Sequence, residues 1–211
     1  GTLRVDGNAN QAGGVNVAGG TLVLNGSNGY MGSTAILAGA TLQVNSGAAL
    51  GSSLGGGLIV AGGTLATTGN VDTSKQVAMF GGTTFDVGAN TTTALHGEVL
   101  GTGPVVKTGQ GTLVLDHANA FSGDTRIDNG TLQIASDGNL GTGGQLIFNG
   151  GSLHTTGDVT SSRNLVLQHD APVAVDAGTQ MSTSGTVSGA GGLVKNGAGV
   201  LAISGAASHT G

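Results

Sequence analysis

The sequence predicts an all-β protein, a parallel β-solenoid of about ten coils, and three observations favour this fold class. A Gly-Thr-Leu motif, or a close variant, recurs along the 211 residues. Each motif opens a run in which apolar residues alternate with residues of any type, as in a strand with one buried face. Gly, Asn, Asp and Ser separate the runs and supply turns. Two or three short strands per ~20-residue repeat are typical of a solenoid, in which stacked coils bury what one coil cannot.

The motif sets two periods. The stretch KTGQGTLVLDHANAFSGDTRIDNGTLQI, residues 107–134, contains it at Gly111 and Gly130. The first inward residues of the successive strands are Leu3, Leu22, Leu42, Leu65, Phe85, Leu113, Leu132, Leu153, Val173 and Leu201. From Leu22 the steps are 20, 23, 20 and 28 residues, and from Leu113 they are 19, 21, 20 and 28. We therefore expect coils of 19–28 residues, four to a long repeat near 90 residues.

The alternation predicts which side chains face inward. The second inward position is apolar or Thr in every strand, as in Val5, Leu24 and Val44. The position between the two inward residues accepts charge and amide freely, as a solvent-facing site would. These expected outward residues are Arg4, Val23, Gln43, Ala66, Asp86, Val114, Gln133, His154, Ala174 and Ala202.

The same periods predict the domain organisation. We expect a single β-helix segment over residues 1–211, with repeat units at about 20–110 and 111–198 and the start of a third at 199–211. Because Gly1-Thr2-Leu3 is already a repeat motif, we expect this segment to be a piece of a longer protein.

The composition excludes several classes of function. The net charge of −5 gives no basic surface, so nucleic acid is not an expected partner. The chain has no cysteine, which excludes a disulfide scaffold and cysteine metal sites. With 44 glycines the chain could be a disordered low-complexity segment, but 37% apolar residues in strict register favour a packed core.

One short motif resembles a catalytic signature. Gly51-Ser52-Ser53-Leu54-Gly55 fits the Gly-x-Ser-x-Gly pattern of a nucleophile elbow, which would make Ser53 the nucleophile. That motif needs a strand before it and a helix after it. More glycine follows Gly55, so the helix is not expected and Ser53 is interpreted as a turn residue.

Other candidate chemistry is equally weak. The five histidines, at positions 96, 117, 154, 169 and 209, have no ligand spacing such as His-Glu-x-x-His. The densest charged group, Asp124 and Asp128 near Arg126, reads as turn residues rather than a glycosidase pair. Thr recurs before the inward Leu, which would suit an ice-binding array, but a β-branched residue at a strand start explains it. We expect no catalytic, cofactor-binding or metal-binding residues, no cofactor, and no enzymatic activity.

The repeat resembles the passenger-associated transport repeat of Gram-negative autotransporters. The residues that carry the resemblance in the central copy are Lys107, Gly109, Gly111, Thr112, Leu113 and Leu115. An Asn-x-aromatic-x-Gly-x-Thr segment follows the first two copies, at Asn28, Tyr30, Gly32 and Thr34 and at Asn119, Phe121, Gly123 and Thr125. The third copy departs from the pattern at Val200, Ala207 and His209.

The resemblance implies a right-handed parallel β-helix at the extracellular surface of a Gram-negative bacterium. It implies a structural or adhesive stalk whose folding assists export across the outer membrane. The alternative is a carrier β-helix for a serine protease or toxin domain elsewhere in the full-length chain. The implied partner is a C-terminal outer-membrane β-barrel translocator of the same chain; host-surface or matrix ligands and self-association stay open.

Overall fold

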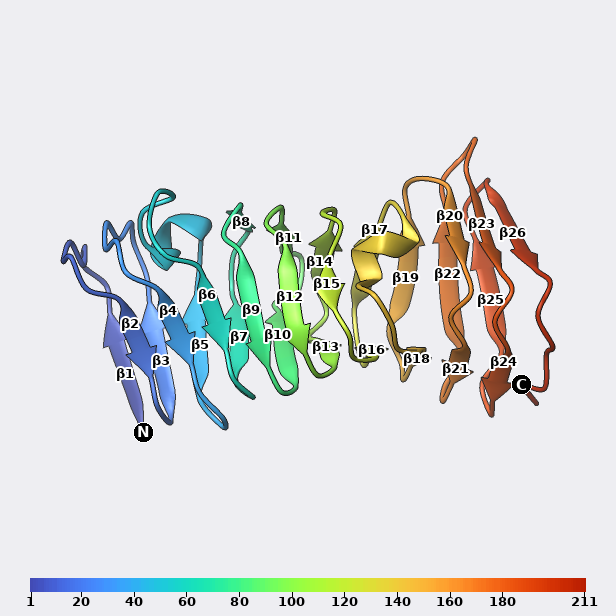
Figure 1. The fold of residues 1–211 in the computed structure, drawn as a ribbon, viewed down its shortest axis with the longest axis horizontal. Coiled ribbons are helices and arrows are strands. Elements are labelled where there is room, and N and C mark those ends of the chain that lie inside the picture. Colours follow the sequence, from blue (N-terminus) through green and yellow to red (C-terminus); the bar gives the residue numbers. More distant parts are fainter.

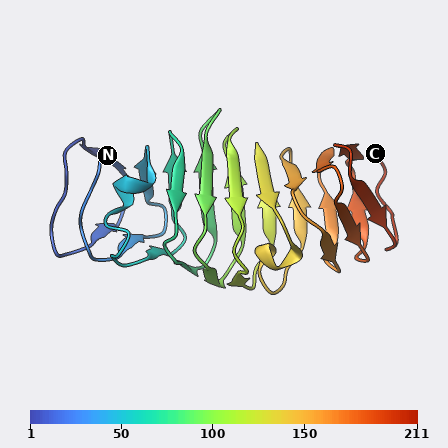
Figure 2. The same ribbon diagram turned by 90° about the horizontal axis from the view of Figure 1, so that it is seen from above.

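The computed structural model describes residues 1–211 as a rod of 26 short strands and two 3₁₀ turns, with the two termini at opposite ends (Figure 1). Every strand pairing is parallel, and each coil lies on the previous one (Figure 2). The predicted all-β parallel solenoid of about ten coils is confirmed. No helix in the structure has the length and apolar character needed to cross a membrane.

The coils have three sides, which form three faces of the rod. The first face is a ten-stranded sheet of β1 (Thr2–Val5), β3 (Thr21–Leu24), β5 (Thr41–Val44), β7 (Thr64–Thr67), β10 (Thr83–Val87), β13 (Val105–Thr108), β16 (Thr125–Ile127), β18 (Leu146–Phe148), β21 (Leu165–Leu167) and β24 (Val187–Gly189). The second face is a seven-stranded sheet of β8 (Val71–Thr73), β11 (Thr92–Leu95), β14 (Thr112–Leu115), β17 (Thr131–Ile134), β19 (Ser152–Thr155), β22 (Ala171–Val175) and β25 (Leu193–Asn196).

The third face is divided between two sheets. Its six-stranded part holds β2 (Val15–Val17), β4 (Thr34–Ile36), β6 (Leu58–Val60), β9 (Val77–Phe80), β12 (Val99–Thr102) and β15 (Ala120–Phe121). Its three-stranded part holds β20 (Val159–Ser161), β23 (Gln180–Thr183) and β26 (Val200–Ile203). The chain visits the first, second and third faces in turn. The 3₁₀ turn η1 (Gly47–Leu50) occupies a side of the second face, and η2 (Asp137–Leu140) separates the two parts of the third.

The strand pairing gives the true coil length. Counted between paired residues of the first face, a coil takes 19 to 23 residues. The residue paired with Phe85 is Lys107, 22 positions on, whereas Leu113 lies on the second face and pairs with Thr93. Likewise Val173 pairs with Lys195, and Leu201 lies on the third face. Each 28-residue step is therefore one coil plus one extra side, and the long repeat is not the four whole coils that the spacing predicts.

The inward side chains form one continuous core. It contains 38 buried residues, which come from every face and run through most of the rod. Like stacks on like, as in the Leu22, Leu42 and Leu65 column of the first face. Burying one such side chain contributes about 1.5–3 kcal/mol. Leu3, at the first coil, is 64% exposed because only one neighbouring coil covers it.

Away from the two end coils, the predicted facing holds with two exceptions in the degree of burial. Val23 and Ala66 occupy expected outward positions but are buried. Each lies between the outward side chains of the coils on either side, with Gln43 next to both of them. A small outward side chain in the middle of a sheet is thus covered by its longer neighbour.

Replacing Leu113 by Asp should destabilise the fold by on the order of 4 kcal/mol, because it places an unpaired carboxylate in the core. Leu113 is fully buried, whereas its neighbour Val114 points outward and is partly exposed. Val114→Asp is the matched control and should cost less than about 1 kcal/mol. Urea unfolding monitored by circular dichroism measures both, and equal losses would mean that the two faces of β14 are assigned the wrong way round.

Candidate functional site

The two 3₁₀ turns lead into loops that leave the strand stack. The loop after η1 covers residues 51–57, and the loop after η2 covers residues 141–145. Both turns follow a strand of the type Thr-Leu-Gln-Val/Ile, and a glycine with positive φ closes each one, Gly51 at 82° and Gly141 at 75°. Ser136 and Asn139 form a capping box on η2. These loops interrupt the regular strand stack and are therefore candidates for a site.

A basic side chain from the next coil holds each loop. The Lys75 ammonium donates to the carbonyl oxygens of Ser52, at 2.7 Å, and Gly56, at 2.8 Å. Arg163 donates to the carbonyl oxygens of Gly141, at 2.6 Å, and Gly143, and pairs with Asp137 at 3.1 Å. Burial lowers the pKa of Lys75 below its usual value. Both cations are committed to backbone carbonyls, so they fix the loops and are not free to act on a ligand.

Lys107 occupies an inward position that the sequence pattern reserves for apolar residues. It is fully buried, stacked between Phe85 and Ile127. Its ammonium donates to the carbonyl oxygens of Thr108, at 2.6 Å, Gly109, at 2.8 Å, and Asn129, at 3.2 Å. Burial lowers the pKa of Lys107 to about 8. In the sequence this lysine is visible only as part of the repeat motif. The two glycines that follow it closely are the available signal for a corner with carbonyl groups that need a donor.

Buried asparagines link three successive coils. Asn28 accepts a hydrogen bond from the Ala9 backbone N–H, at 2.8 Å, and donates to the Ala49 carbonyl, at 2.9 Å. Asn119 accepts from the Val99 N–H, at 2.8 Å, and donates to the Asn139 carbonyl, at 2.6 Å. These side chains satisfy backbone groups where the strand ladder is interrupted. The asparagine of the repeat pattern is therefore structural.

The aromatic and threonine positions of the pattern form a second buried pair. The hydroxyl groups of Tyr30 and Thr34 lie 2.7 Å apart and share a hydrogen bond. In the next copy the pair is Phe121 and Thr125, and the Thr125 hydroxyl is buried without a partner. Burial, the largest cause, raises the pKa of Tyr30. A phenol held in this way serves packing.

The outward charged groups form local pairs. His96 Nδ1 lies 2.6 Å from Asp116 Oδ2, and His96 Nε2 lies 3.3 Å from Asp72 Oδ1, so one imidazole joins three coils. The hydrogen bond with Asp116 raises the pKa of His96 above its usual value. His154 pairs with Asp176 at 2.8 Å. No group of three or more acidic, histidine or cysteine side chains is arranged to hold a metal ion.

The remaining candidate residues from the sequence make contacts that support the fold. The elbow-like segment with Ser53 follows a 3₁₀ turn and leads into a loop, so it lacks the strand-to-helix context of a nucleophile elbow. Asp124 accepts a hydrogen bond from the Gln145 N–H, and Asp128 accepts from Arg126 and Asn149. These carboxylates connect neighbouring coils.

Threonines do form an outward row on the first face. Thr2, Thr21, Thr41, Thr64 and Thr84 are in register on five successive coils. The next outward row on the same strands is mixed and consists of Arg4, Val23, Gln43, Ala66 and Asp86. A single row does not make the flat two-dimensional threonine array that would match ice.

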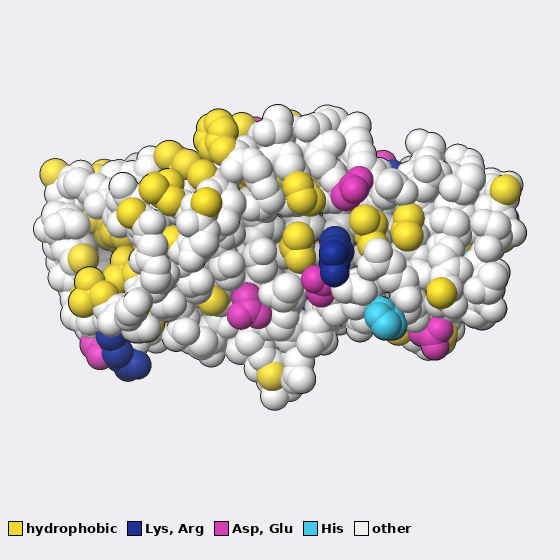
Figure 3. Space-filling view, turned by 90° about the horizontal axis from the view of Figure 1, so that it is seen from below, with side chains coloured by type: hydrophobic (Ala, Val, Ile, Leu, Met, Phe, Trp, Pro, Cys, Tyr) yellow, Lys and Arg dark blue, Asp and Glu magenta, His cyan; other side chains and the backbone are white.

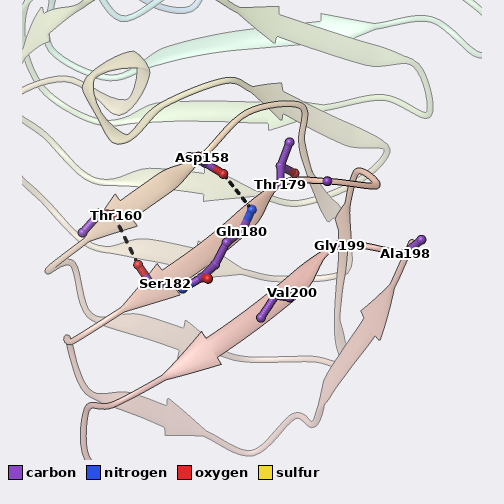
Figure 4. A pocket seen from close by; sticks show the side chains of 9 residues that line it. Asp158, Thr160, Thr179, Gln180, Ser182, Ala198, Gly199 and Val200 are labelled. Atoms are coloured by element: carbon purple, nitrogen blue, oxygen red, sulfur yellow. Dashed lines mark hydrogen bonds between the residues drawn. The ribbon is translucent and has the colours of Figure 1, made fainter.

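The hollows of the surface are open and polar. One of about 520 Å³ lies on the outer side of β20, β23 and β26, lined by Asp158, Thr160, Gln180 and Ser182 among others. Figure 4 shows that two of these groups bond across coils, Asp158 with the Gln180 N–H and Ser182 with Thr160. Another, of about 610 Å³, lies beside η1. The space-filling view shows few charges on one face, with hydrophobic side chains gathered toward the N-terminal end (Figure 3).

These features define a class: a repeat-built parallel β-solenoid whose buried polar and charged side chains hold coils and corners together. Four segments of the chain, residues 1–24, 19–44, 105–134 and 193–211, match the passenger-associated-transport-repeat family. The chain thus carries passenger-associated transport repeats, and in these repeats it is similar to the passengers of autotransporters. Such a passenger is displayed outside the cell of a Gram-negative bacterium.

A curated relative supports the assignment. The chain is 40% identical over 119 residues to the adhesin BmaC autotransporter of Brucella suis biovar 1 (strain 1330). The aligned part is 56% of this chain and 4% of the relative, so the chain spans a small fraction of that protein's length. No solved structure matches the chain.

Phe121→Tyr should stabilise the fold by about 1 kcal/mol, because the new hydroxyl can partner the orphaned Thr125 hydroxyl as Tyr30 partners Thr34. The matched variant Tyr30→Phe should destabilise it by about 1–2 kcal/mol, since it leaves Thr34 buried and unpartnered. Thermal unfolding of both variants measures the two shifts. If Phe121→Tyr also destabilises, the second copy lacks the space that this comparison assumes.

Lys107 should make stability rise with pH above about 8. Its folded pKa is about 8, below the usual 10.5. Between these values the unfolded chain binds more protons than the folded chain, so the free energy of unfolding increases as pH rises. Urea unfolding at pH 7 to 10 should show wild type gaining stability relative to Lys107→Met. Lys195→Met, which removes an exposed ammonium, controls for the lost charge; a pH-independent difference for Lys107→Met would rule out the buried charge as the cause.

Proposed function

We propose that the segment is a structural and adhesive stalk in a surface-displayed autotransporter passenger, and that its folding outside the cell assists export. The observation that carries the proposal is that the buried polar side chains bond to the protein's own backbone. Lys75, Lys107, Arg163, Asn28 and Asn119 all bond to backbone groups that the coils leave free. A chain whose buried polar side chains bond to its own backbone in this way is suited to holding a long rod together.

The stacking of coils supports the role in export. Each coil contacts only its neighbours, so the stability of a solenoid is roughly a sum over coils and interfaces. A chain that emerges unfolded can therefore fold coil by coil, and each new coil buries apolar surface on the previous one. The absence of cysteine suits passage as an unfolded chain. The partner in this proposal is a C-terminal outer-membrane translocator barrel of the same full-length chain.

The adhesive part of the proposal rests on the relative, which is named an adhesin. The surface of this segment carries few charges, open polar hollows and scattered exposed apolar side chains such as Phe80 and Leu54. We treat residues 20–110, 111–198 and 199–211 as the repeat units of the stalk and expect no enzymatic activity in them.

Surface display should depend on the stability of the core. In the full-length protein, Leu113→Asp should reduce the amount of passenger detected on intact cells several-fold, because the coil that carries it cannot pack. Val114→Asp should leave display near wild type. Flow cytometry with an antibody to the passenger measures both at matched expression. Equal display of the two variants would mean that export does not depend on the folding of these coils.

The stalk assignment has a test of its own. The purified segment should turn over no peptide, ester or polysaccharide substrate. Hydrolysis that Ser53→Ala abolishes, or that disappears when Asp124 and Asp128 are both changed to Asn, would overturn the stalk in favour of an enzyme.

A further inference from the structure

The corner between β16 and β17, in the middle part of the rod, contains the dipeptide Asn129-Gly130 (Figure 1). Asn129 is exposed, and Gly130 has a positive φ of 65°. A Cβ on Gly130 would lie 2.4 Å from the Gly111 carbonyl oxygen, so the stacking of the coils requires glycine here. The fold therefore places an unhindered backbone amide directly after an exposed asparagine, where the amide nitrogen can attack the asparagine side chain.

The Gly130 amide lies against the group that it would attack. Its N–H donates to Asn129 Oδ1 at 2.7 Å and makes no hydrogen bond to another backbone group. The carboxamide carbon is one C=O bond, about 1.2 Å, from that oxygen, so nucleophile and electrophile are held close together. The Asn129 amide nitrogen makes no hydrogen bond to the protein. Ring closure and loss of ammonia therefore break no contact between coils.

A buried cation lies at the carbonyl group of the same peptide bond. The Lys107 ammonium donates to the Asn129 carbonyl oxygen at 3.2 Å and is fixed there by its bonds to the Thr108 and Gly109 carbonyls. When the Gly130 N–H gives up its proton, the negative charge is shared between that nitrogen and the Asn129 carbonyl oxygen. The ammonium is placed to stabilise this charge, and its burial strengthens the effect. Lys107 therefore makes the attacking nitrogen easier to form.

Three other Asn-Gly pairs lack this arrangement. Asn25 and Asn149 each donate their side-chain amide to a carboxylate, that of Asp6 at 2.7 Å and that of Asp128 at 3.0 Å. Each amide is thus held in place, and a negative charge opposes the formation of a second one beside it. Asn28 is buried, and both ends of its amide are bonded to the backbone.

We propose that Asn129 deamidates in the folded protein, with the Gly130 amide nitrogen as the nucleophile and Lys107 as the group that promotes its attack. The nitrogen bonds to the carboxamide carbon and the bond from that carbon to Nδ2 breaks. The amide group takes up the proton that Gly130 has given up and leaves as ammonia. The product is a five-membered succinimide ring. Water then opens the ring at one of its two carbonyl groups and yields aspartate or isoaspartate, so one water is consumed for each ammonia released.

Both products change the corner. Each adds one carboxylate to a chain of net charge −5, beside the Lys107 ammonium. Isoaspartate also inserts a methylene group into the backbone between the Asp128 N–H, which bonds to the Lys107 carbonyl, and the Thr131 N–H, which bonds to the Gly111 carbonyl. Those two bonds fix the corner on the previous coil, so the longer backbone disturbs the stacking there. The proposal does not depend on the role of the segment in adhesion or export.

Mass spectrometry of the intact folded segment tests the proposal. The protein is incubated in heavy-oxygen water at neutral pH and then digested in ordinary water, so each succinimide that hydrolysed during the incubation leaves its label at a known pair. Asn129 should convert about tenfold faster than Asn25, Asn28 and Asn149. The pair at Asn196 is not compared, because β25 is the edge strand of its sheet. Conversion of Asn129 no faster than that of the other three would overturn the proposal.

Lys107→Met tests the role of the ammonium. It should slow the conversion of Asn129 in the folded protein by about tenfold and leave Asn25 and Asn149 unchanged. A lysine that only tightened the corner would have the opposite effect, because a looser backbone lets the amide nitrogen reach the side chain more often. Unchanged or faster conversion of Asn129 would therefore contradict the proposal. Lys195→Met, which removes an exposed ammonium at the equivalent position of the next copy, is the matched control and should not alter Asn129.

The same measurement in urea separates the folded corner from the local sequence. Without the coils, the four compared pairs have only the Asn-Gly sequence in common, so they should convert at similar rates in wild type and in Lys107→Met. If Asn129 keeps its full lead in urea, the local sequence is the cause and the proposal fails. The comparison of wild-type protein in buffer and in urea needs no variant, so it decides the matter even if circular dichroism shows that Lys107→Met does not fold.

Discussion

The structure depends on the in-register stacking of parallel strands. At a spacing of about 4.8 Å, each side chain lies directly on its counterpart in the next coil, so every inward position must be apolar or must have its own polar partner. The constraint also explains the glycine that opens the central copy of the motif. A Cβ on Gly111 would lie 2.2 Å from the Gly88 carbonyl oxygen, because the corner of one coil rests on the corner of the coil before it. A larger residue at Gly111 would push these two coils apart.

Stacking also couples residues that are far apart in sequence, and the two copies show this coupling. The hydroxyls of Thr67 and Thr93 share a 2.8 Å hydrogen bond in the core. The positions 88 residues on hold Thr155 and Met181, and the Thr155 hydroxyl is buried without a partner. One member of the pair has changed to an apolar residue while the other has kept its hydroxyl. At this position a buried hydroxyl therefore depends on a partner in the neighbouring coil.

Much of the fold could be predicted from the sequence, because alternation and the Gly-Thr-Leu corner report directly on facing and turning. The strands that lack this motif could not be predicted as sides of the solenoid. β13 reads Val-Val-Lys-Thr and β25 reads Leu-Val-Lys-Asn, so their inward lysines hid them as sides of the solenoid, and the spacing across them looked like one long coil. The roles of Lys75, Lys107 and Arg163 were missed for a related reason. They depend on carbonyls of other coils, which no local pattern reveals.

The difference between the sequence period and the coil period has a physical basis. A side of the solenoid requires only a side of similar length above and below it, and it does not matter which copy of the repeat supplies that side. β14 pairs with β11 and β17, and β20 pairs with β23; all of these pairings are parallel. A repeat of any whole number of sides can therefore be added to the rod without breaking register. Only a multiple of three keeps equivalent surfaces in line. With the thirteen sides that separate β3 from its sequence counterpart β14, the core stays continuous while equivalent surfaces turn from one copy to the next. The inward positions repeat with the coil, whereas the loops repeat with the longer sequence period, so packing and surface display are separated in one chain.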